Sequence, residues 1–231
     1  MKKSILCAIL VCCNILLIHA ESSQFIGVHA GFTQPITRLN APNVGMEKKL
    51  NPTIYNGFKL GAVYDATLVK GFGYTIAINY TFGENRTDWK QVGSYPYPRQ
   101  HTRDYYHQLE IPVDWQYKFR IAQNTWFILY SGPTLQCGLA FSKNTHKQTL
   151  SSGDIDVTKY DRFKDFQRLN VTWGVGAGLQ FDRYFIRGGY DFGLINPFKA
   201  DKFIVTEDYQ PYTRGRFDQW QIKLGIYLFS W

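Results

Sequence analysis

Apolar and polar residues alternate with a period of two along most of this chain. Between residues 72 and 82 the even positions are bulky and apolar, whereas the odd positions are small or polar. Residues 169–181 repeat the pattern, with apolar odd positions and glycine at positions 174, 176 and 178. Because successive side chains of a strand point to opposite faces of a sheet, each segment predicts a two-faced strand.

The same alternation marks six further segments, so the chain is expected to form eight strands. Most of them are longer than the roughly 5–6 residues typical of strands in soluble domains and reach the roughly 9–11 tilted residues that cross a bilayer. Near the end of the chain the apolar positions change parity between Leu228 and Phe229, which predicts a β-bulge. The six segments are residues 25–33, 55–66, 105–118, 125–142, 184–194 and 214–231.

Long and short connections alternate between these strands. The short connections are residues 67–71, 119–124 and 182–183, and the long ones are residues 34–54, 83–104, 143–168 and 195–213. This asymmetry predicts an all-β fold: an eight-stranded antiparallel up-and-down transmembrane β-barrel with long outer loops and short periplasmic turns. Within the third long loop, apolar residues at intervals of three from Tyr160 to Leu169 indicate a short helix.

The first twenty residues have the composition of a secretory signal. Two lysines are followed by an apolar stretch at residues 5–18 and by Ala20, after which cleavage is expected. An uncleaved anchor helix and lipoprotein processing at Cys12 or Cys13 are the less favoured alternatives. The barrel domain then spans residues 21–231, and we expect it in the outer membrane of a Gram-negative bacterium. Cleavage would leave Cys137 as the single cysteine, so no intramolecular disulfide can form.

The charged residues of the strands fall on the polar parity. An Arg or Lys that faces hydrocarbon at mid-bilayer costs about 2–4 kcal/mol, so these side chains should point into the barrel. The interior of an eight-stranded barrel is just wide enough for side chains to fill. We therefore predict an ion-paired interior without a large pore, formed by Lys59, Glu110, Asp114, Arg187, Asp191 and Lys223.

The apolar parity should face lipid, with aromatic girdles at the two interfaces. Phe32, Tyr64, Phe72, Tyr80, Phe82, Tyr105, Trp115, Tyr117 and Phe181 lie toward the strand ends. A soluble periplasmic barrel that binds a small apolar ligand is the alternative, because alternation alone does not exclude it. The glycine-rich and charged opposite parity favours the membrane barrel, since it does not suit the lining of an apolar ligand cavity.

The net charge of +8 does not indicate a nucleic-acid partner. Without Lys2 and Lys3 there remain 24 basic and 18 acidic residues, an excess of about +6 that is scattered through the loops rather than clustered. The expected contacts of the barrel are instead outer-membrane lipid and lipopolysaccharide. The second long loop mixes aromatic and basic residues that suit a saccharide or a protein surface: Trp89, Lys90, Tyr95, Tyr97, Arg99 and Arg103. Of its basic residues, Arg86, Lys90, Arg99 and Arg103 could also bind lipopolysaccharide phosphates.

Catalytic and cofactor signals are weak. His107 is the best candidate base, with Ser94 or Ser131 as nucleophile, but Glu110 lies on the opposite face of its strand and no G-x-S-x-G motif occurs. The histidines are dispersed, which gives no metal-ligand spacing, and no phosphate-binding fingerprint precedes a predicted helix. We expect no enzyme activity, no cofactor and no metal, and a structural or binding role through the outer loops.

Three motifs resemble strands of the small outer-membrane barrels related to PorT. They are HQLEIPV at residues 107–113, YSGP at residues 130–133, and GVGAG at residues 174–178 followed by RGGYDFGL at residues 187–194. The resemblance covers about residues 105–194. It implies a barrel with variable outer loops and the barrel-assembly machinery as a partner during insertion. It also implies, as an alternative role, a component of a PorT-associated protein-secretion apparatus with envelope proteins as partners.

The chain departs from this family pattern at two places. Asp114 and Trp115 replace a plainer aliphatic sequence, and the chain ends in Trp231 instead of the usual terminal Phe. A terminal aromatic residue still fits recognition by the assembly machinery. The resemblance is therefore more specific for the fold than for the function.

Overall fold

The computed structural model describes residues 23–43, 46–49, 53–91, 99–148, 155–197, 199 and 214–231. The predicted signal segment, residues 1–20, lies outside these ranges. No helix within them is both long enough and apolar enough to cross a membrane.

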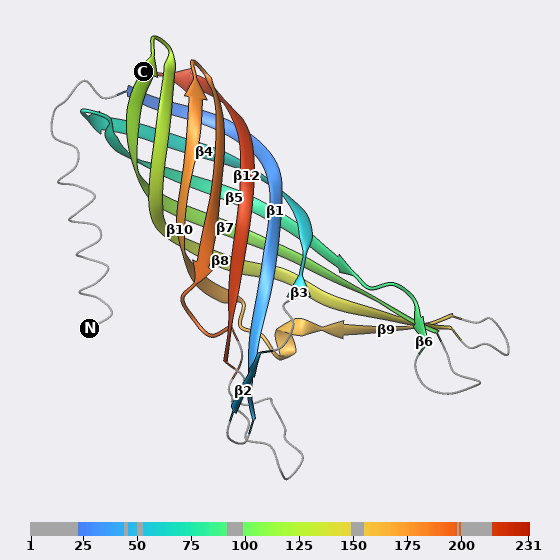
Figure 1. Ribbon diagram of the computed structural model, residues 1–231. Helices are drawn as coiled ribbons and strands as arrows, with labels where there is room; N and C mark the ends of the chain where they lie inside the picture. Colours follow the sequence, from blue (N-terminus) through green and yellow to red (C-terminus); the bar gives the residue numbers. More distant parts are fainter. Residues whose placement is uncertain are drawn as a thin grey trace.

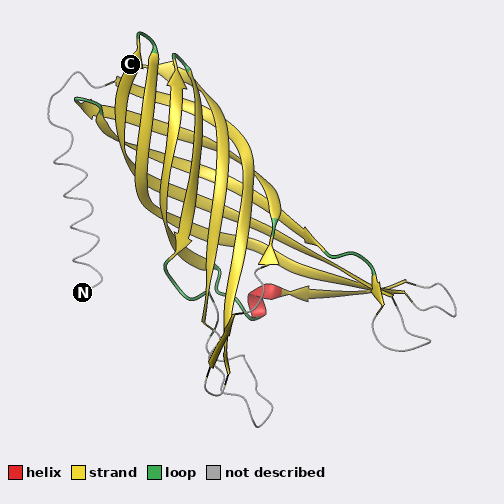
Figure 2. Ribbon diagram, viewed as in Figure 1, coloured by secondary structure: helices red, strands yellow, loops and turns green. Residues whose placement is uncertain are grey.

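Eight long strands of the described residues form a closed antiparallel ring (Figures 1 and 2). Each strand pairs with its neighbour in the chain, and β1 pairs with β12 to close the ring. A closed ring satisfies every strand edge, which a sheet in lipid requires. The strands are β1 (Ser23–Asn43), β4 (Asn56–Val69), β5 (Phe72–Arg86), β7 (Arg99–Ala122), β8 (Thr125–Gln148), β10 (Leu169–Phe181), β11 (Tyr184–Gly193) and β12 (Arg214–Ser230). The predicted fold class is confirmed.

One end of the ring carries tight turns. Two residues join β4 to β5, and both have positive φ, 49° at Lys70 and 88° at Gly71. This is the pattern of a type I′ turn, whose twist matches that of the flanking strands. Two-residue turns also join β7 to β8 and β10 to β11 at this end, and β12 ends here as well (Figure 1).

The predicted bulge near the end of the chain is present. Ile26 pairs with Phe229 and Gly27 pairs with Tyr227, so Leu228 is the extra residue of β12. Leu228 and Phe229 are consequently both exposed, at 48% and 63%, while Tyr227 is buried in the interior.

The outer surface of the ring is an apolar belt. Ile78 and Leu224 are 58% and 63% exposed, although both lie at the middle of their strands. The outward parities of β5 and β10 are exposed as predicted, and no second sheet of the described residues covers them. This rejects the sandwich and favours a barrel whose belt faces lipid.

β7 and β8 continue beyond the ring at the end opposite the tight turns (Figure 1). There β6 (Lys90–Gln91) pairs with β7, and β9 (Ile155–Asp161) pairs with β8. We call the sheet formed by β6, residues 99–106, residues 141–148 and β9 the outer blade. β2 (Met46–Lys49) and β3 (Thr53–Ile54) similarly pair with the outer part of β1.

The outer blade differs from the prediction that residues 83–104 and 143–168 are loops. Every residue of β9 is exposed on both faces, so its sequence lacks the alternation that identified the other strands. The helix indicated between Tyr160 and Leu169 is reduced to one 3-10 turn, η1 (Arg162–Lys164), because β9 extends to Asp161.

Three inward glycines of β10 leave room for larger interior side chains, as predicted. A Cβ atom at Gly174 would lie 2.5 Å from Asp191 Oδ1, and one at Gly178 would lie 2.9 Å from Arg187 Cγ. At Gly176 it would collide with the ring of Tyr130. The absence of side chains at these three glycines therefore leaves the space that the neighbouring interior side chains occupy.

Gly176→Leu should prevent the barrel from closing, because the new side chain has no space beside Tyr130. Ala177→Leu is the matched control, since the neighbouring position points to lipid. We expect residues 21–231 with the control substitution to fold in detergent and to show a gel mobility that changes on boiling. Equal mobility shifts for Gly176→Leu and the control would contradict this packing.

Candidate functional site

Asp65 is the centre of an ion-paired cluster in the half of the barrel nearer the tight turns. Its Oδ1 accepts from Lys118 Nζ at 2.9 Å, and its Oδ2 accepts from Arg187 Nη2 at 2.7 Å. Tyr227 and Gln116 donate to the same carboxylate at 2.5 and 2.7 Å. All five side chains are buried, so each charge is paired and hydrogen-bonded, as burial in a low-dielectric interior requires.

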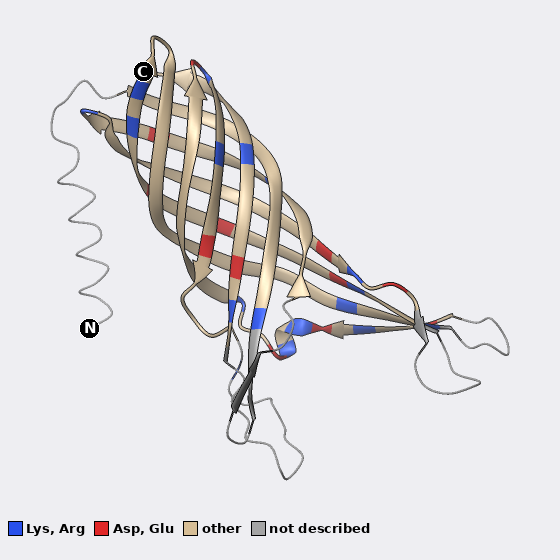
Figure 3. Ribbon diagram, viewed as in Figure 1, with Lys and Arg blue, Asp and Glu red and all other residues tan. Residues whose placement is uncertain are grey.

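Lys59 and Glu110 form a second buried ion pair, in the half nearer the outer blade. Lys59 Nζ donates to Glu110 Oε2 at 2.5 Å and to Gln221 at 2.6 Å. Glu110 also accepts from Thr81 at 2.8 Å and from Gln108. Figure 3 shows charged positions distributed along the wall strands and the outer blade.

The other three predicted interior residues are buried but form no ion pair within 4.0 Å with the described residues. Asp191 is buried and accepts from Gln219 and Gln221 at 3.3 and 2.9 Å. Asp114 and Lys223 are also buried and carry opposite charges. The structure thus places all six predicted residues inside the ring, and Arg187 joins the Asp65 cluster.

The prediction omitted Asp65, which, like Arg187, makes four interior side-chain hydrogen bonds. Asp65 shares the parity of Lys59 on β4, and Lys118 shares the parity of Glu110 and Asp114 on β7. Extending the same parity along both strands would have identified them. Tyr227 was harder to place, because it adjoins the bulge of β12.

An aromatic cap closes the outer mouth of the barrel. Tyr55, Phe141, Phe163 and Phe166 are buried against one another, with Tyr106 and Phe217 packed beside them. The mouth beneath the cap holds a cavity of about 10 Å³, close to the space one water molecule needs. The cap and the two ion-paired clusters together fill the middle and the outer end of the described interior.

Polar contacts hold η1 over the mouth. Arg162 forms an ion pair with Asp104 at 3.0 Å, and the Gly138 N–H donates to the carbonyl of Arg168 at 2.7 Å. Tyr160 donates to both carboxylate oxygens of Asp165 at 2.9 Å, and this interaction raises the pKa of Tyr160.

The outward face of the blade and the adjoining end of β5 carry a row of basic side chains. Arg86 pairs with Arg103, Arg103 with Asn144, and Asn144 with Lys159. Residues that are directly paired project on the same side of a sheet, so these four lie side by side across four strands. On β5 and β7 this side has the parity that faces lipid in the ring. We call Arg86, Arg103 and Lys159 the cationic row.

Rings flank the cationic row toward the blade tip. Trp89 lies 5.4 Å from His101, and His101 lies 5.5 Å from His146, measured between ring centroids. Arg103 Nε donates to His101 Nε2 at 3.1 Å, and His101 Nδ1 donates to the carbonyl of Thr87. The blade therefore holds Arg103 in place on its exposed surface.

The predicted outer-loop residues are only partly brought together. Trp89 and Arg103 lie on the same side of the blade, about one imidazole ring apart. Lys90 and Arg99 belong to β6 and β7, where the backbones of Gln91 and Arg99 pair. Tyr95 and Tyr97 lie outside the described residues. Arg86, also expected at lipopolysaccharide phosphates, and Lys159, which was not predicted, complete the row.

The candidate catalytic residues lie apart. The His107 ring is hydrogen-bonded to the Tyr80 hydroxyl at 2.6 Å, whereas Ser131 donates to the carbonyl of Gly174 and accepts from Trp173. Ser131 pairs with Trp115, eight residues from His107, which is about 27 Å along β7. Ser94 is outside the described residues. The described part of the chain contains no group of three or more His, Cys, Asp or Glu residues that could hold a metal.

The chain matches the family model described as "outer membrane protein beta-barrel domain" over residues 20–199. It belongs to this family. Membership points to the outer membrane of a Gram-negative bacterium, in agreement with the closed ring and its apolar belt. A comparison with curated proteins gave no match.

Solved outer-membrane proteins are similar to this chain at low identity. The attachment invasion locus protein Ail of Yersinia pestis, solved with the heparin analogue sucrose octasulfate, is 13% identical, with 90% of this chain and 100% of that chain covered and a TM-score of 0.38. Neisserial surface protein A is 12% identical, with 88% and 97% covered and a TM-score of 0.36. The translocator domain of NalP from Neisseria meningitidis is 9% identical, with 98% and 95% covered and a TM-score of 0.36.

Asp65→Ala should destabilise the barrel by about 3–5 kcal/mol, because it leaves Lys118 and Arg187 as buried charges without their carboxylate. Asp156→Ala on the exposed β9 is the control and should change the unfolding free energy little. Urea unfolding in detergent, followed by tryptophan fluorescence, measures both. Equal midpoints for the two variants would show that the Asp65 cluster does not stabilise the barrel.

Proposed function

We propose that this protein is an outer-membrane anchor that binds lipopolysaccharide phosphates through the outward face of its blade. The observation that carries the proposal is the cationic row, which crosses four strands on the side facing lipid. The protein would act as a structural or binding component of the cell surface and not as an enzyme.

The filled interior supports an anchoring role rather than a transport role. Two ion-paired clusters occupy the ring and an aromatic cap lies over its outer mouth. Passage of a solute would require these buried pairs to separate, and removing one charge from its partner in a low-dielectric interior is costly.

The arrangement of like charges supports an anionic ligand. Arg86 and Arg103 are direct cross-strand partners, and like charges in that position repel each other. A phosphate between them would offset this repulsion, and guanidinium groups bind phosphate with paired hydrogen bonds. Glu84 and Asp161 lie in the adjacent row toward the ring and partly offset the positive charge of this surface. The affinity for phosphate would therefore depend more on the spacing of the cations than on the net charge.

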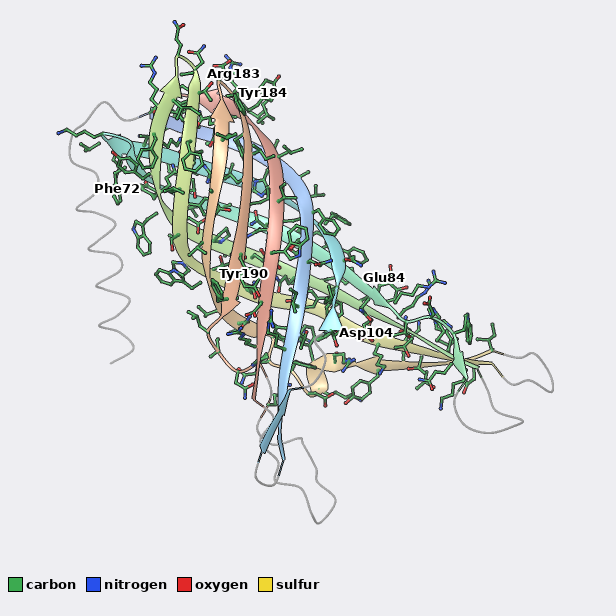
Figure 4. The ribbon with its side chains drawn as sticks, viewed as in Figure 1. Phe72, Glu84, Asp104, Arg183, Tyr184 and Tyr190 are labelled. Carbon is green, nitrogen blue, oxygen red and sulfur yellow. The ribbon has the colours of Figure 1, made fainter. Side chains whose placement is uncertain are left out.

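The position of the row favours a lipid-linked phosphate. Arg103 lies four residues from His107, which is about 13 Å along the strand. His107 packs against Phe82, and both belong to the aromatic residues at the outer end of the apolar belt. The row would therefore lie at the level of the outer-leaflet headgroups, on the side where those headgroups are. Figure 4 shows Glu84 and Asp104 toward this outer end and Phe72, Arg183 and Tyr184 at the opposite end.

The PorT-like role in secretion remains a narrower hypothesis that rests on the sequence motifs alone. It would require contacts with other envelope proteins, for which the exposed blade is the accessible surface. The soluble-barrel alternative is disfavoured, because burying an apolar ligand inside would displace the paired charges while the apolar belt stayed in water.

Arg86→Gln combined with Arg103→Gln should weaken lipopolysaccharide binding at least about tenfold, because the loss of even one charge-assisted contact costs about that factor. Lipopolysaccharide titrated onto the detergent-folded protein measures the change. Lys143→Gln combined with Lys147→Gln removes two charges from the opposite face of the same blade and should bind as the unmodified protein does. Equal losses in both double variants would overturn the assignment to one face.

The unmodified barrel should show no steady ion conductance in a planar lipid bilayer, because its interior is filled and capped. Asp65→Asn serves as the comparison, because it keeps the shape of the side chain but removes the negative charge that pairs with Lys118 and Arg187. Large, uniform conductance steps from the unmodified protein would contradict the anchoring role and indicate a channel.

A further inference from the structure

A bowl opens at the end of the barrel that carries the tight turns. It has a volume of about 460 Å³ and is formed by β1, β4, β7, β8, β10 and the turn between β4 and β5. Short turns mark the periplasmic end of an outer-membrane barrel, so the bowl faces the periplasm and the inner leaflet. Its lining combines three cations with aromatic and amide side chains, namely Lys70, Lys118, Arg120, Phe25, Trp126 and Gln180.

We propose that this bowl binds the phosphate of a glycerophospholipid from the inner leaflet of the outer membrane. The site lies at the opposite end from the cationic row and uses none of its residues. The result of testing this site is therefore independent of the result of testing the proposed function.

The electrostatic balance of the bowl favours an anion. None of its lining residues is acidic, and the nearest interior carboxylate is that of Asp65, which already accepts from Lys118, Arg187 and Tyr227. Lys118 is ion-paired with Asp65, but Lys70 and Arg120 have no carboxylate partner among the described residues, so these two charges at the rim repel each other. A bound phosphate would relieve that repulsion.

Each cation retains donors for such a ligand. Lys118 Nζ donates to Asp65 at 2.9 Å and to Gln180 at 3.1 Å, so one of its three N–H groups is left for a ligand. Arg120 donates from Nε and Nη2 to the carbonyls of Ala122 and Gln123, which fixes the guanidinium and leaves Nη1. The exposed Lys70 ammonium makes no hydrogen bond or ion pair with the described residues.

The strand register brings these groups to one rim. Arg120 pairs with Trp126, and Trp126 pairs with Gln180, so the three side chains form a row across β7, β8 and β10. Lys118 N donates to the carbonyl of Gly71 at 2.7 Å, which holds the turn bearing Lys70 against β7. The positive φ of Lys70 and Gly71 fixes the direction of that turn.

The same opening borders the lipid-facing surface, which identifies the occupant as a lipid. Tyr117 and Phe119 line the bowl and are also 40% and 44% exposed on the outward face of β7. Their rings lie 4.5 Å apart, as is typical of an interfacial aromatic girdle. A phospholipid could therefore keep its acyl chains along the apolar belt while its phosphate reaches the cations across the rim.

The test is lipid retention by the folded barrel, measured by native mass spectrometry. The delipidated protein in detergent is mixed with phosphatidylglycerol or with diacylglycerol of the same chains, which lacks the phosphate. We expect one phosphatidylglycerol per barrel and no retained diacylglycerol. Lys70→Gln combined with Arg120→Gln should weaken retention at least about tenfold, since two charge-assisted contacts are lost.

Arg183→Gln is the matched control, because Arg183 is an exposed cation in the turn between β10 and β11 at the same end and does not line the bowl. It should retain phosphatidylglycerol as the unmodified protein does. Equal loss in this control would overturn the proposal in favour of general surface charge. Displacement of the lipid by millimolar inorganic phosphate would overturn the lipid source and indicate a site for soluble phosphate. The heat-dependent gel shift confirms that each variant is folded.

Discussion

Closing eight strands into one ring fixes the width of the interior, and the remaining features of this barrel follow from that width. The ring removes every open strand edge, as lipid demands, but it leaves space for side chains and not for bulk water. Charges placed inside must therefore find partners among themselves. The Asp65 carboxylate pairs with both Lys118 and Arg187, and the Glu110 carboxylate pairs with Lys59.

The same limit explains the distribution of small residues. Long interior side chains such as Arg187 and Tyr130 come from β11 and β8, and the facing positions on β10 are glycines. The glycine at each of these positions is set by the volume of its neighbour rather than by its own backbone angles. The size of each interior side chain is consequently matched by the space left on the neighbouring strand.

The amino-acid sequence predicts the wall of the barrel better than it predicts the ends. Strand parity placed Lys59, Glu110 and Arg187 in the interior because lipid on one side imposes a strict alternation. Outside the membrane both faces of β9 meet water, so the physical cause of the alternation is absent and the strand was predicted as loop. The cationic row was incompletely predicted for the same reason. Its members come together through strand pairing, and spacing along the chain does not reveal it.

A single extra residue in β8 links the wall to the outer end. Leu139 and Ala140 are both exposed, and the register shifts where β7 passes from His107 to Gln108. The residues that follow in β8 therefore exchange faces: Phe141 turns inward to the aromatic cap, while Asn144 turns outward to the cationic row. Without this bulge Phe141 would point to lipid and Lys143 would lie on the outward face. The closed mouth and the composition of the blade surface thus depend on the same one-residue change of register.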